Sequence, residues 1–214
     1  GSIPDIGGPA ANMWGAACMA DPSRCQRASC LTPQICRHFR HAQGAWLKML
    51  QRVAILPGVR HIRVASGVRH DLALADPAAF RALAGRFVGG QLKLAPEHCV
   101  GRVLRLMRKP PFKAFEEALS IFERISRAHD KEQYIVPYLM TAFPGCDDGD
   151  MRALASWLRA RGWKPRQVQC FVPTPGTVAT AMYYACIDPE GTPIPVARSD
   201  AERIRQHRIL MPRD

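Results

Sequence analysis

The sequence predicts an α/β fold in which short parallel strands alternate with helices. The spacing of its apolar positions switches repeatedly between about two residues, typical of strands, and about 3.6 residues, typical of helices. Strand-like and helical runs also follow one another in strand–helix–strand order, which gives parallel pairing through right-handed crossovers. Either a barrel or an open doubly wound sheet satisfies this order.

Four segments are predicted as strands because each is short, rich in β-branched or aromatic residues and followed by polar or turn residues. They are residues 61–66, 91–95, 134–140 and 167–172. Pro137 lies inside the third segment, and we expect a bulge or local irregularity there because proline cannot donate a ladder hydrogen bond.

The segments between these strands are predicted as helices with one apolar face. A first helix should end at Pro57-Gly58, and Asp76-Pro77 should cap and open the second. Phe115, Leu119, Phe122 and Ile125 mark a third, and residues 148–161 form the last. Three carboxylates cluster at the start of that last helix, where capping explains them better than a metal site: Asp147, Asp148 and Asp150.

Composition and charge narrow the class of protein. A hydrophobic content of 47% in 214 residues supports a sizeable buried core. Apolar runs fall far short of the roughly 18 residues of a membrane span, and no secretory signal opens the chain, so we expect a cytoplasmic protein without membrane contact. The net charge is +12, but Lys and Arg are spread along the length, which favours solvated helix faces over a nucleic-acid tract.

Eight cysteines without a secretory signal favour metal or redox chemistry over disulfides. Four thiols and an imidazole fall within about twenty residues, enough ligands for zinc or an iron–sulfur cluster. Their spacing is wider than that of a zinc knuckle, so zinc and an auxiliary iron–sulfur cluster both stay open. The predicted metal ligands are Cys18, Cys25, Cys30, Cys36 and His38. The scattered cysteines are predicted mostly to be small buried residues.

Function should lie in the loops after the strands, since parallel barrels place their chemistry at the carboxyl ends of the strands. The sequence has no Gly-x-Gly-x-x-Gly or Walker loop after any strand, which weakens dinucleotide-binding and NTPase interpretations. The loops that remain are residues 5–13, 66–71, 93–98, 141–145 and 171–177. In this order, together with the Cys-rich segment, they resemble the YgiQ-type family of radical S-adenosylmethionine (SAM) proteins.

The resemblance implies a partial parallel β/α barrel of the TIM type over residues 1–184, with a Cys-rich insertion at 18–41 and a truncated tail at 185–214. It also implies an enzyme that uses a 4Fe-4S cluster and SAM for radical chemistry on an unidentified substrate, with an electron donor such as flavodoxin or ferredoxin. The family's Cys-x3-Cys-x2-Cys cluster loop does not occur in this chain. We therefore expect it upstream of Gly1, and we expect this fragment alone to be inactive.

The resemblance further implies contacts to SAM. Gly7-Gly8 matches the motif that binds the methionyl amino group, with Pro9 where the family has an acidic residue. The other implied positions lie after later strands, where polar side chains could meet the ribose or carboxylate and tight turns could border the adenine. They are Ser66, Arg69, Lys93, Glu97, His98, Pro144, Gly145, Pro175 and Gly176.

Two other functions compete with this one. A metal-stabilised nucleic-acid-binding module would use the positive charge and the Cys-rich loop, and it predicts strongly salt-dependent binding to RNA. Its basic residues are not interleaved with aromatics, which counts against it. An unrelated barrel enzyme such as an aldolase would need a lysine or paired acids at strand ends, and Lys93 with Glu97 is its only support.

Overall fold

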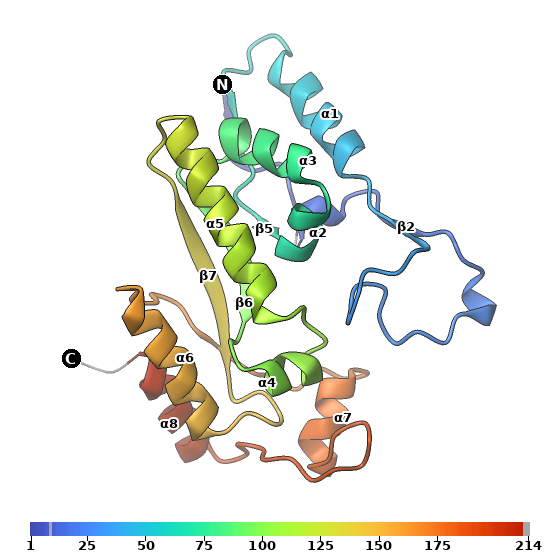
Figure 1. Cartoon of the computed structure of the whole chain (residues 1–214), viewed down its shortest axis with the longest axis vertical. Coiled ribbons are helices and arrows are strands. Elements are labelled where there is room, and N and C mark those ends of the chain that lie inside the picture. Colours follow the sequence, from blue (N-terminus) through green and yellow to red (C-terminus); the bar gives the residue numbers. More distant parts are fainter. Residues whose placement is uncertain (9, 212–214) are drawn as a thin grey trace. The chain divides into compact units, whose positions relative to one another are not determined.

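The computed structural model describes residues 1–8 and 10–211 and divides into two compact units (Figure 1). The first unit comprises Gly1–Ala95 and Lys113–Pro137, and the second comprises Pro96–Phe112 and Tyr138–Asp214. Within the described ranges, no helix combines the length and the apolar character that crossing a membrane requires.

The strands are short and mostly parallel. A parallel pair and an antiparallel pair stand apart from a four-stranded sheet, whose order is β5-β6-β7-β8. The α/β class is therefore confirmed, but among the described residues the strands form separate sheets and not a closed barrel. The strands are β1 (Ser2–Ile3) with β4 (His61–Ile62), β2 (Ala17–Cys18) with β3 (Phe39–Arg40), and β5 (Gly67–Val68), β6 (Gln91–Glu97), β7 (Tyr134–Thr141) and β8 (Gln169–Cys170).

The helices form where the apolar spacing predicts them, with additional ones between. Asp76 caps its helix by accepting from the Ala79 N–H at 3.0 Å, and Asp147 and Asp150 form a reciprocal capping box, as predicted. The helices are α1 (Gln43–Ala54), α2 (His70–Ala75), α3 (Pro77–Ala82), α4 (Gly101–Leu106), α5 (Phe112–Ala128), α6 (Asp148–Ala160), α7 (Val178–Ala185) and α8 (Asp200–Leu210), with 3₁₀ turns η1 (Ala11–Met13) and η2 (Pro22–Arg24) and the π-helical turn η3 (Leu83–Phe87).

The strand predicted over residues 61–66 is wrong as a single element. Within these residues only β4 (His61–Ile62) is a strand, and it pairs with β1, whereas β5 begins beyond them at Gly67 and pairs with β6. The break lies where the Asp5 carboxylate takes the backbone N–H groups of Ala65 and Ser66, at 2.8 and 3.2 Å. Because those donors are used by a side chain, they cannot extend a strand ladder. Pro137, in contrast, lies within a continuous β7.

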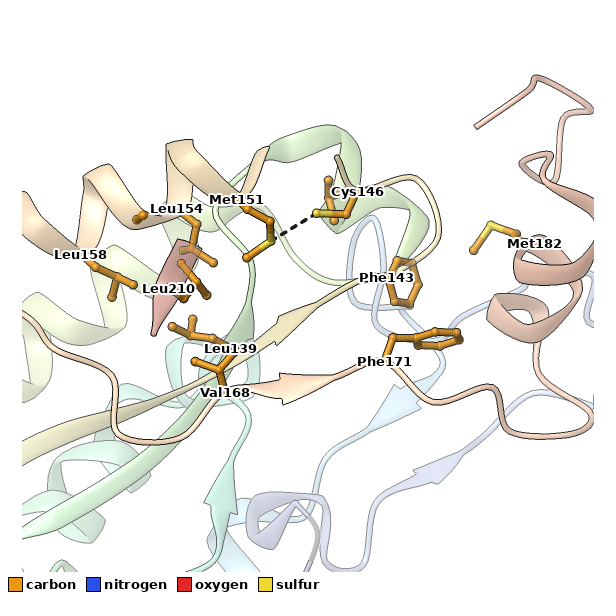
Figure 2. Close-up of a cluster of buried hydrophobic side chains, with 12 residues drawn as sticks. Leu139, Phe143, Cys146, Met151, Leu154, Leu158, Val168, Phe171, Met182 and Leu210 are labelled. Atoms are coloured by element: carbon orange, nitrogen blue, oxygen red, sulfur yellow. Dashed lines mark hydrogen bonds between the residues drawn. The ribbon is translucent and has the colours of Figure 1, made fainter. Parts of the chain in front are cut away.

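Each unit has its own apolar interior. In the first unit the Phe80 and Phe122 rings stack with their centroids 6.5 Å apart, and both are almost fully buried. In the second unit, side chains of α6 pack against the strands and against α8 (Figure 2). The buried members of this second core are Val103, Leu139, Phe143, Cys146, Met151, Leu154, Ala155, Leu158, Val168, Phe171, Met182 and Leu210.

The segment expected as a tail after the barrel contains α8, which belongs to this second core through Leu210. A Ser199–Glu202 capping box starts the helix, with the Glu202 N–H donating to Ser199 Oγ at 3.3 Å. A serine followed three residues later by glutamate is visible in the sequence, so the start of α8 could have been predicted from it.

Candidate functional site

Gly7 is packed too closely against its neighbours to carry a side chain. A Cβ at this position would stand 2.6 Å from Ser66 Oγ and 3.1 Å from Asp5 Oδ1. Ser66 Oγ donates to Asp5 Oδ2, so Asp5, Gly7 and Ser66 form one contact cluster in the first unit. The structure thus brings Gly7 and Ser66 together through Asp5, a residue that the sequence analysis did not single out.

The Asp5 carboxylate is the charged centre of this cluster. Partial burial would raise its pKa, but hydrogen bonds from Ser66 and Ala65 and the positive charge of Lys93 together hold the pKa below its ordinary value. Lys93 therefore lies within electrostatic range of the cluster. Gly8 next to it has open space where a Cβ would stand, while the predicted Pro9 lies outside the described residues.

Arg69 is held by a partner within its own segment. Its guanidinium donates to both oxygens of Asp71, at 3.1 and 2.6 Å, and its backbone N–H and C=O are both bound by the Asn12 side chain. Asn12 is buried and also donates to Gln43 at 3.3 Å. Because Asp71 already occupies the bidentate fork of Arg69, the immediate role of this arginine is to fix the loop between β5 and α2.

Glu97 ends β6 with an unusual backbone. Its φ is +64°, the left-handed region that residues with a Cβ adopt only at a cost. Its carboxylate accepts from Lys109 Nζ at 3.1 Å, and both side chains are largely buried. Ala142, which directly follows β7, has φ +58°. Strained residues thus stand where two strands end, a place where parallel sheets carry function.

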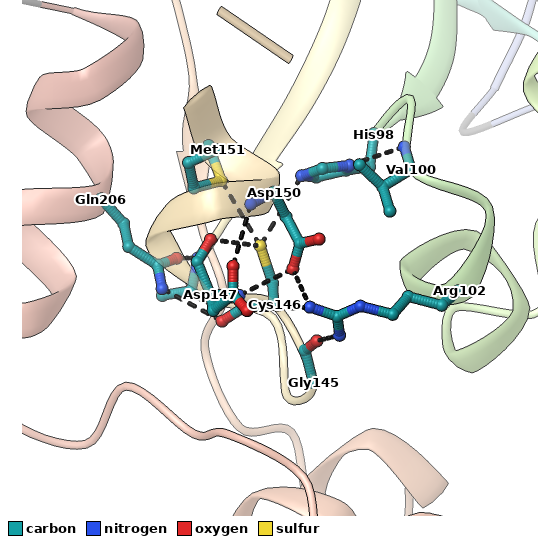
Figure 3. Close-up of polar contacts among 10 residues, drawn as sticks. His98, Val100, Arg102, Gly145, Cys146, Asp147, Asp150, Met151 and Gln206 are labelled. Atoms are coloured by element: carbon teal, nitrogen blue, oxygen red, sulfur yellow. Dashed lines mark hydrogen bonds and ion pairs between the residues drawn. The ribbon is translucent and has the colours of Figure 1, made fainter. Parts of the chain in front are cut away.

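His98, predicted to contact SAM, is a buried residue of the second unit (Figure 3). Its Nδ1 accepts from the Val100 N–H at 3.0 Å, and its Nε2 lies 3.6 Å from Cys146 Sγ. Burial, with the nearby positive charge of Arg102, lowers the pKa of His98 from 6.5 to about 4. The imidazole is therefore neutral at physiological pH.

This shift predicts a pH dependence of stability. The unfolded chain takes up a proton at His98 more readily than the folded one between pH 6.5 and about 4, so the contribution is complete above pH 6.5 and is lost as the pH falls toward 4. The loss should reach at most about 3 kcal/mol. His98→Asn keeps an acceptor for the Val100 N–H and removes the titration, so urea unfolding at several pH values should lose this component in the variant.

The control for this series is His61→Asn, because His61 is exposed on β4. It should leave the pH profile of the unfolding free energy unchanged. An equally steep profile in His98→Asn would show that other groups cause the pH dependence.

Cys146 is a buried thiol held in its neutral form. It contacts Met151 Sδ at 3.5 Å, and burial, followed by the charges of Asp150 and Asp147, strongly raises its pKa. A thiol of this kind packs as a small apolar residue and is unsuited to nucleophilic attack. The prediction that the isolated cysteines are structural is confirmed for Cys146.

Arg102 of α4 joins the loop after β7 to the start of α6 (Figure 3). It donates to the Gly145 carbonyl oxygen, to Asp147 at 3.0 Å and to Asp150 at 2.5 Å. Burial raises the pKa of Asp150, whereas the backbone N–H of Asp150 lowers the pKa of Asp147. The pKa values of the two carboxyl groups are thus shifted in opposite directions. Both groups cap the start of α6 and form ion pairs with Arg102.

Gln206 of α8 closes the same loop from its other side. The buried side chain accepts from the Ala142 N–H at 2.9 Å and donates to the Cys146 carbonyl at 3.1 Å. Gln206 therefore fixes both ends of residues 142–146, which overlap the site loop predicted over residues 141–145. A lone glutamine in a polar helix gave no signal for this role.

The remaining predicted turn residues differ in their surroundings. Pro144 and Gly145 are buried, Gly145 has φ +89°, and its N–H donates to the Pro195 carbonyl at 2.7 Å. Pro175 and Gly176 are exposed, with φ +78° at Gly176. Thr177 after them caps α7 by accepting from the Thr180 N–H at 3.2 Å. Both loops are tight turns, as their proline and glycine residues predict.

The second unit also has a cavity of about 570 Å³ beside the start of α6. It is lined by Asp147, Asp148 and Arg152 of that helix region and by Arg205 and Gln206 of α8. Two of its charged groups are paired with each other, since Arg205 donates to Asp148 at 2.6 Å. None of the residues predicted to contact SAM lines it.

The four clustered cysteines and His38 line a single cavity of about 500 Å³ in the first unit. Cys18 and Cys25 are exposed, Cys30 is partly buried and Cys36 is buried. Within the part of the chain that the structure describes, no three His, Cys, Asp or Glu side chains converge closely enough to define a metal centre by themselves.

These features define an α/β protein whose parallel strands end in polar side chains and tight turns. The chain is similar over nearly its whole length to UPF0313 proteins: it is 45% identical over 214 residues to one from Geobacter sulfurreducens, 40% over 213 residues to one from Methanosarcina mazei, and 37% over 219 residues to one from Pseudomonas aeruginosa. These matches cover 99%, 98% and 99% of this chain and 35%, 34% and 29% of the relatives.

The chain therefore spans about a third of the length of these curated relatives, whose names state no activity. No family model matches the chain. The similarity links the sequence to UPF0313 proteins and leaves its activity to be proposed.

Proposed function

We propose that the chain is part of a radical SAM enzyme and supplies SAM-binding loops of a partial β/α barrel. The observation that carries this proposal is the pair of glycines in the first unit, where Gly7 is packed against Ser66 and Asp5 and Gly8 is left open. Bare backbone of this kind can approach a ligand closely, and its carbonyl groups can accept from an ammonium group. The loops at residues 66–71, 93–98, 141–145 and 171–177 support the proposal, because they follow one another in the order of the YgiQ-type family that the sequence resembles.

The residues present fit SAM in chemical type. Asp5 is an acceptor for an ammonium or for ribose hydroxyls, and Lys93 is a donor for a carboxylate. Thr141, the last residue of β7, is fully buried, and its hydroxyl has no hydrogen-bond partner among the described residues. An orphaned hydroxyl of this kind at the carboxyl end of a strand is a group that a ligand could satisfy.

Arg69 and His98 act in this proposal by positioning, because Asp71 and Cys146 already contact them. Arg69 holds the loop after β5, and His98 holds the backbone that follows Glu97. In such enzymes bound SAM supplies an adenosyl radical that abstracts hydrogen from the substrate. This chain would hold SAM and exclude water around it.

The 4Fe-4S cluster of such enzymes does not fit the residues of this chain. Three thiolates spaced as Cys-x3-Cys-x2-Cys must wrap one cluster, and the closest cysteines here, Cys25 and Cys30, are five positions apart. In our proposal the cluster, the electron donor and the substrate meet residues outside this chain.

The binding part of the proposal can be tested on the chain itself. Calorimetric titration with SAM should give saturable binding, and Gly8→Val should weaken it at least tenfold, because its side chain fills the space left open for the ligand. The matched control is Gly44→Val, since Gly44 also has open space around a Cβ but lies in α1. Equal affinity in both variants, or no binding by the unmodified chain, would contradict the assignment.

The catalytic part requires the longer polypeptide that carries the expected Cys-x3-Cys-x2-Cys loop. After anaerobic reconstitution with iron and sulfide and addition of a reductant, it should convert SAM into 5′-deoxyadenosine. Intact SAM in that assay would count against radical chemistry.

A further inference from the structure

The segment between β2 and β3 has almost no apolar core to fold around. Its ends are fixed by the antiparallel pairing of Cys18 with Phe39, and it runs between them as a long loop (Figure 1). Leaving the Pro22 side chain aside, Cys36 is the one buried side chain in residues 19–38. Ordering these residues costs backbone entropy that so few buried contacts cannot offset, so the loop needs another source of stability.

Cysteines lie at regular intervals around this loop and face the same cavity. Cys18, Cys25, Cys30 and Cys36 all line the space of about 500 Å³. The Cys36 N–H donates to the Cys30 carbonyl at 2.7 Å, which folds the last part of the loop back on itself. The Cys30 side chain makes a hydrogen bond with that of Cys18 and lies within electrostatic range of Cys25 and Cys36.

The surroundings of the cavity suit a centre of negative charge. Four thiolates around a divalent ion carry a net charge of about −2. Arg27 and Arg37 line the same cavity and would offset that charge, whereas Arg24 is paired there with Asp21 at 3.6 Å. His38 is less suited to be a ligand, because its Nε2 already lies 3.1 Å from the Arg37 Nε donor and its side chain is exposed.

We propose that Cys18, Cys25, Cys30 and Cys36 bind one zinc ion through their thiolates, and that this ion orders residues 18–39 in place of an apolar core. Zinc can stabilise such a loop, because it forms closed tetrahedral sites with thiolates and its binding contributes to the free energy of folding. Zinc itself takes no part in redox chemistry. The side chains must move together on binding, because they do not converge on one point in the described residues. The proposal is independent of SAM binding.

The first test is the zinc content and affinity of the chain purified under reducing conditions. We expect one zinc ion per chain, and each single Cys→Ser change at these four positions should weaken binding by more than about a hundredfold. Cys170→Ser and Cys186→Ser are matched controls outside the cavity and should keep full zinc content. His38→Gln should change the affinity by no more than about threefold, since the imidazole is not a ligand in this proposal.

The second test follows the order of the loop itself. Arg24, Arg27 and Arg37 are exposed trypsin sites within it. Zinc-loaded chain should resist cleavage there, and removing the metal with a chelator should make these bonds the first to be cut. A Cys→Ser variant that unfolds altogether would instead be cut throughout, which separates loss of the site from loss of the fold.

Several results would overturn the proposal. They are absence of zinc in the reduced chain, full zinc content in the fourfold Cys→Ser variant, or visible absorption with acid-labile sulfide from an iron–sulfur cluster. Failure of SAM binding would leave the zinc site untouched, so the two assignments can fail separately.

Discussion

Replacing Gln206 by leucine should destabilise the second unit by about 4 kcal/mol. The substitution leaves two buried backbone groups without partners, the Ala142 N–H and the Cys146 carbonyl. Each such group costs about 1–3 kcal/mol when it is buried without a hydrogen bond. Both backbone groups lie in the loop after β7. The substitution should therefore destabilise this loop, which also contains Ala142 and Gly145 with positive φ angles.

Urea unfolding followed by circular dichroism measures this effect as a lower midpoint. The control is Arg208→Leu on the same helix, where the side chain is exposed and the change should stay within about 0.5 kcal/mol. A loss below about 1 kcal/mol in Gln206→Leu would mean that water satisfies the two backbone groups.

Replacing Gly145 by alanine should cost a similar amount, about 4 kcal/mol. Its φ of +89° is a conformation that residues with a Cβ adopt at a cost of about 1–2 kcal/mol. An added Cβ would also overlap Leu106 Cδ1 in a closely packed region, and overpacking of this kind costs about 1–3 kcal/mol.

Two variants separate these terms in the same unfolding assay. Gly162→Ala carries the conformational cost alone, because φ is +66° there and no atom lies within 4 Å of the added Cβ, so we expect about 1 kcal/mol. Combining Gly145→Ala with Leu106→Ala removes the overlap, so the pair should destabilise less than the sum of the two single changes. Strict additivity would show that no overlap exists.

Local signals in the sequence were sufficient for α1, α3, α5 and α6, whereas α2, α4, α7 and α8 were not predicted. Asp76 and Asp147 cap α3 and α6, and their carboxylates could be assigned to capping because each precedes an apolar helical run. Each predicted strand segment contains a strand, but β8 covers only Gln169–Cys170 of residues 167–172, and β4 covers only His61–Ile62 of residues 61–66. The backbone after β4 is diverted by Asp5, a residue about sixty positions away that no local pattern connects to it.

The candidate site could be predicted only in part. Gly7 and Ser66 were named from their loops and do lie together, but Asp5, which joins them, was not. Arg69 and His98 were named as ligand contacts, and the structure gives them partners in Asp71 and Cys146. Asp71 was close enough in sequence to suggest an ion pair, whereas Cys146 lies 48 residues from His98.

The sequence by itself determined the α/β class, the helix caps and the glycine-and-proline turns, because each depends on the conformational preferences of residues within a few positions. Only the tertiary structure decided which strands pair, that His98 and Cys146 are buried and neutral, and that Gln206 holds a loop 60 to 64 positions before it. These properties depend on desolvation and on hydrogen bonds between distant segments, and burial exists only once the chain has folded.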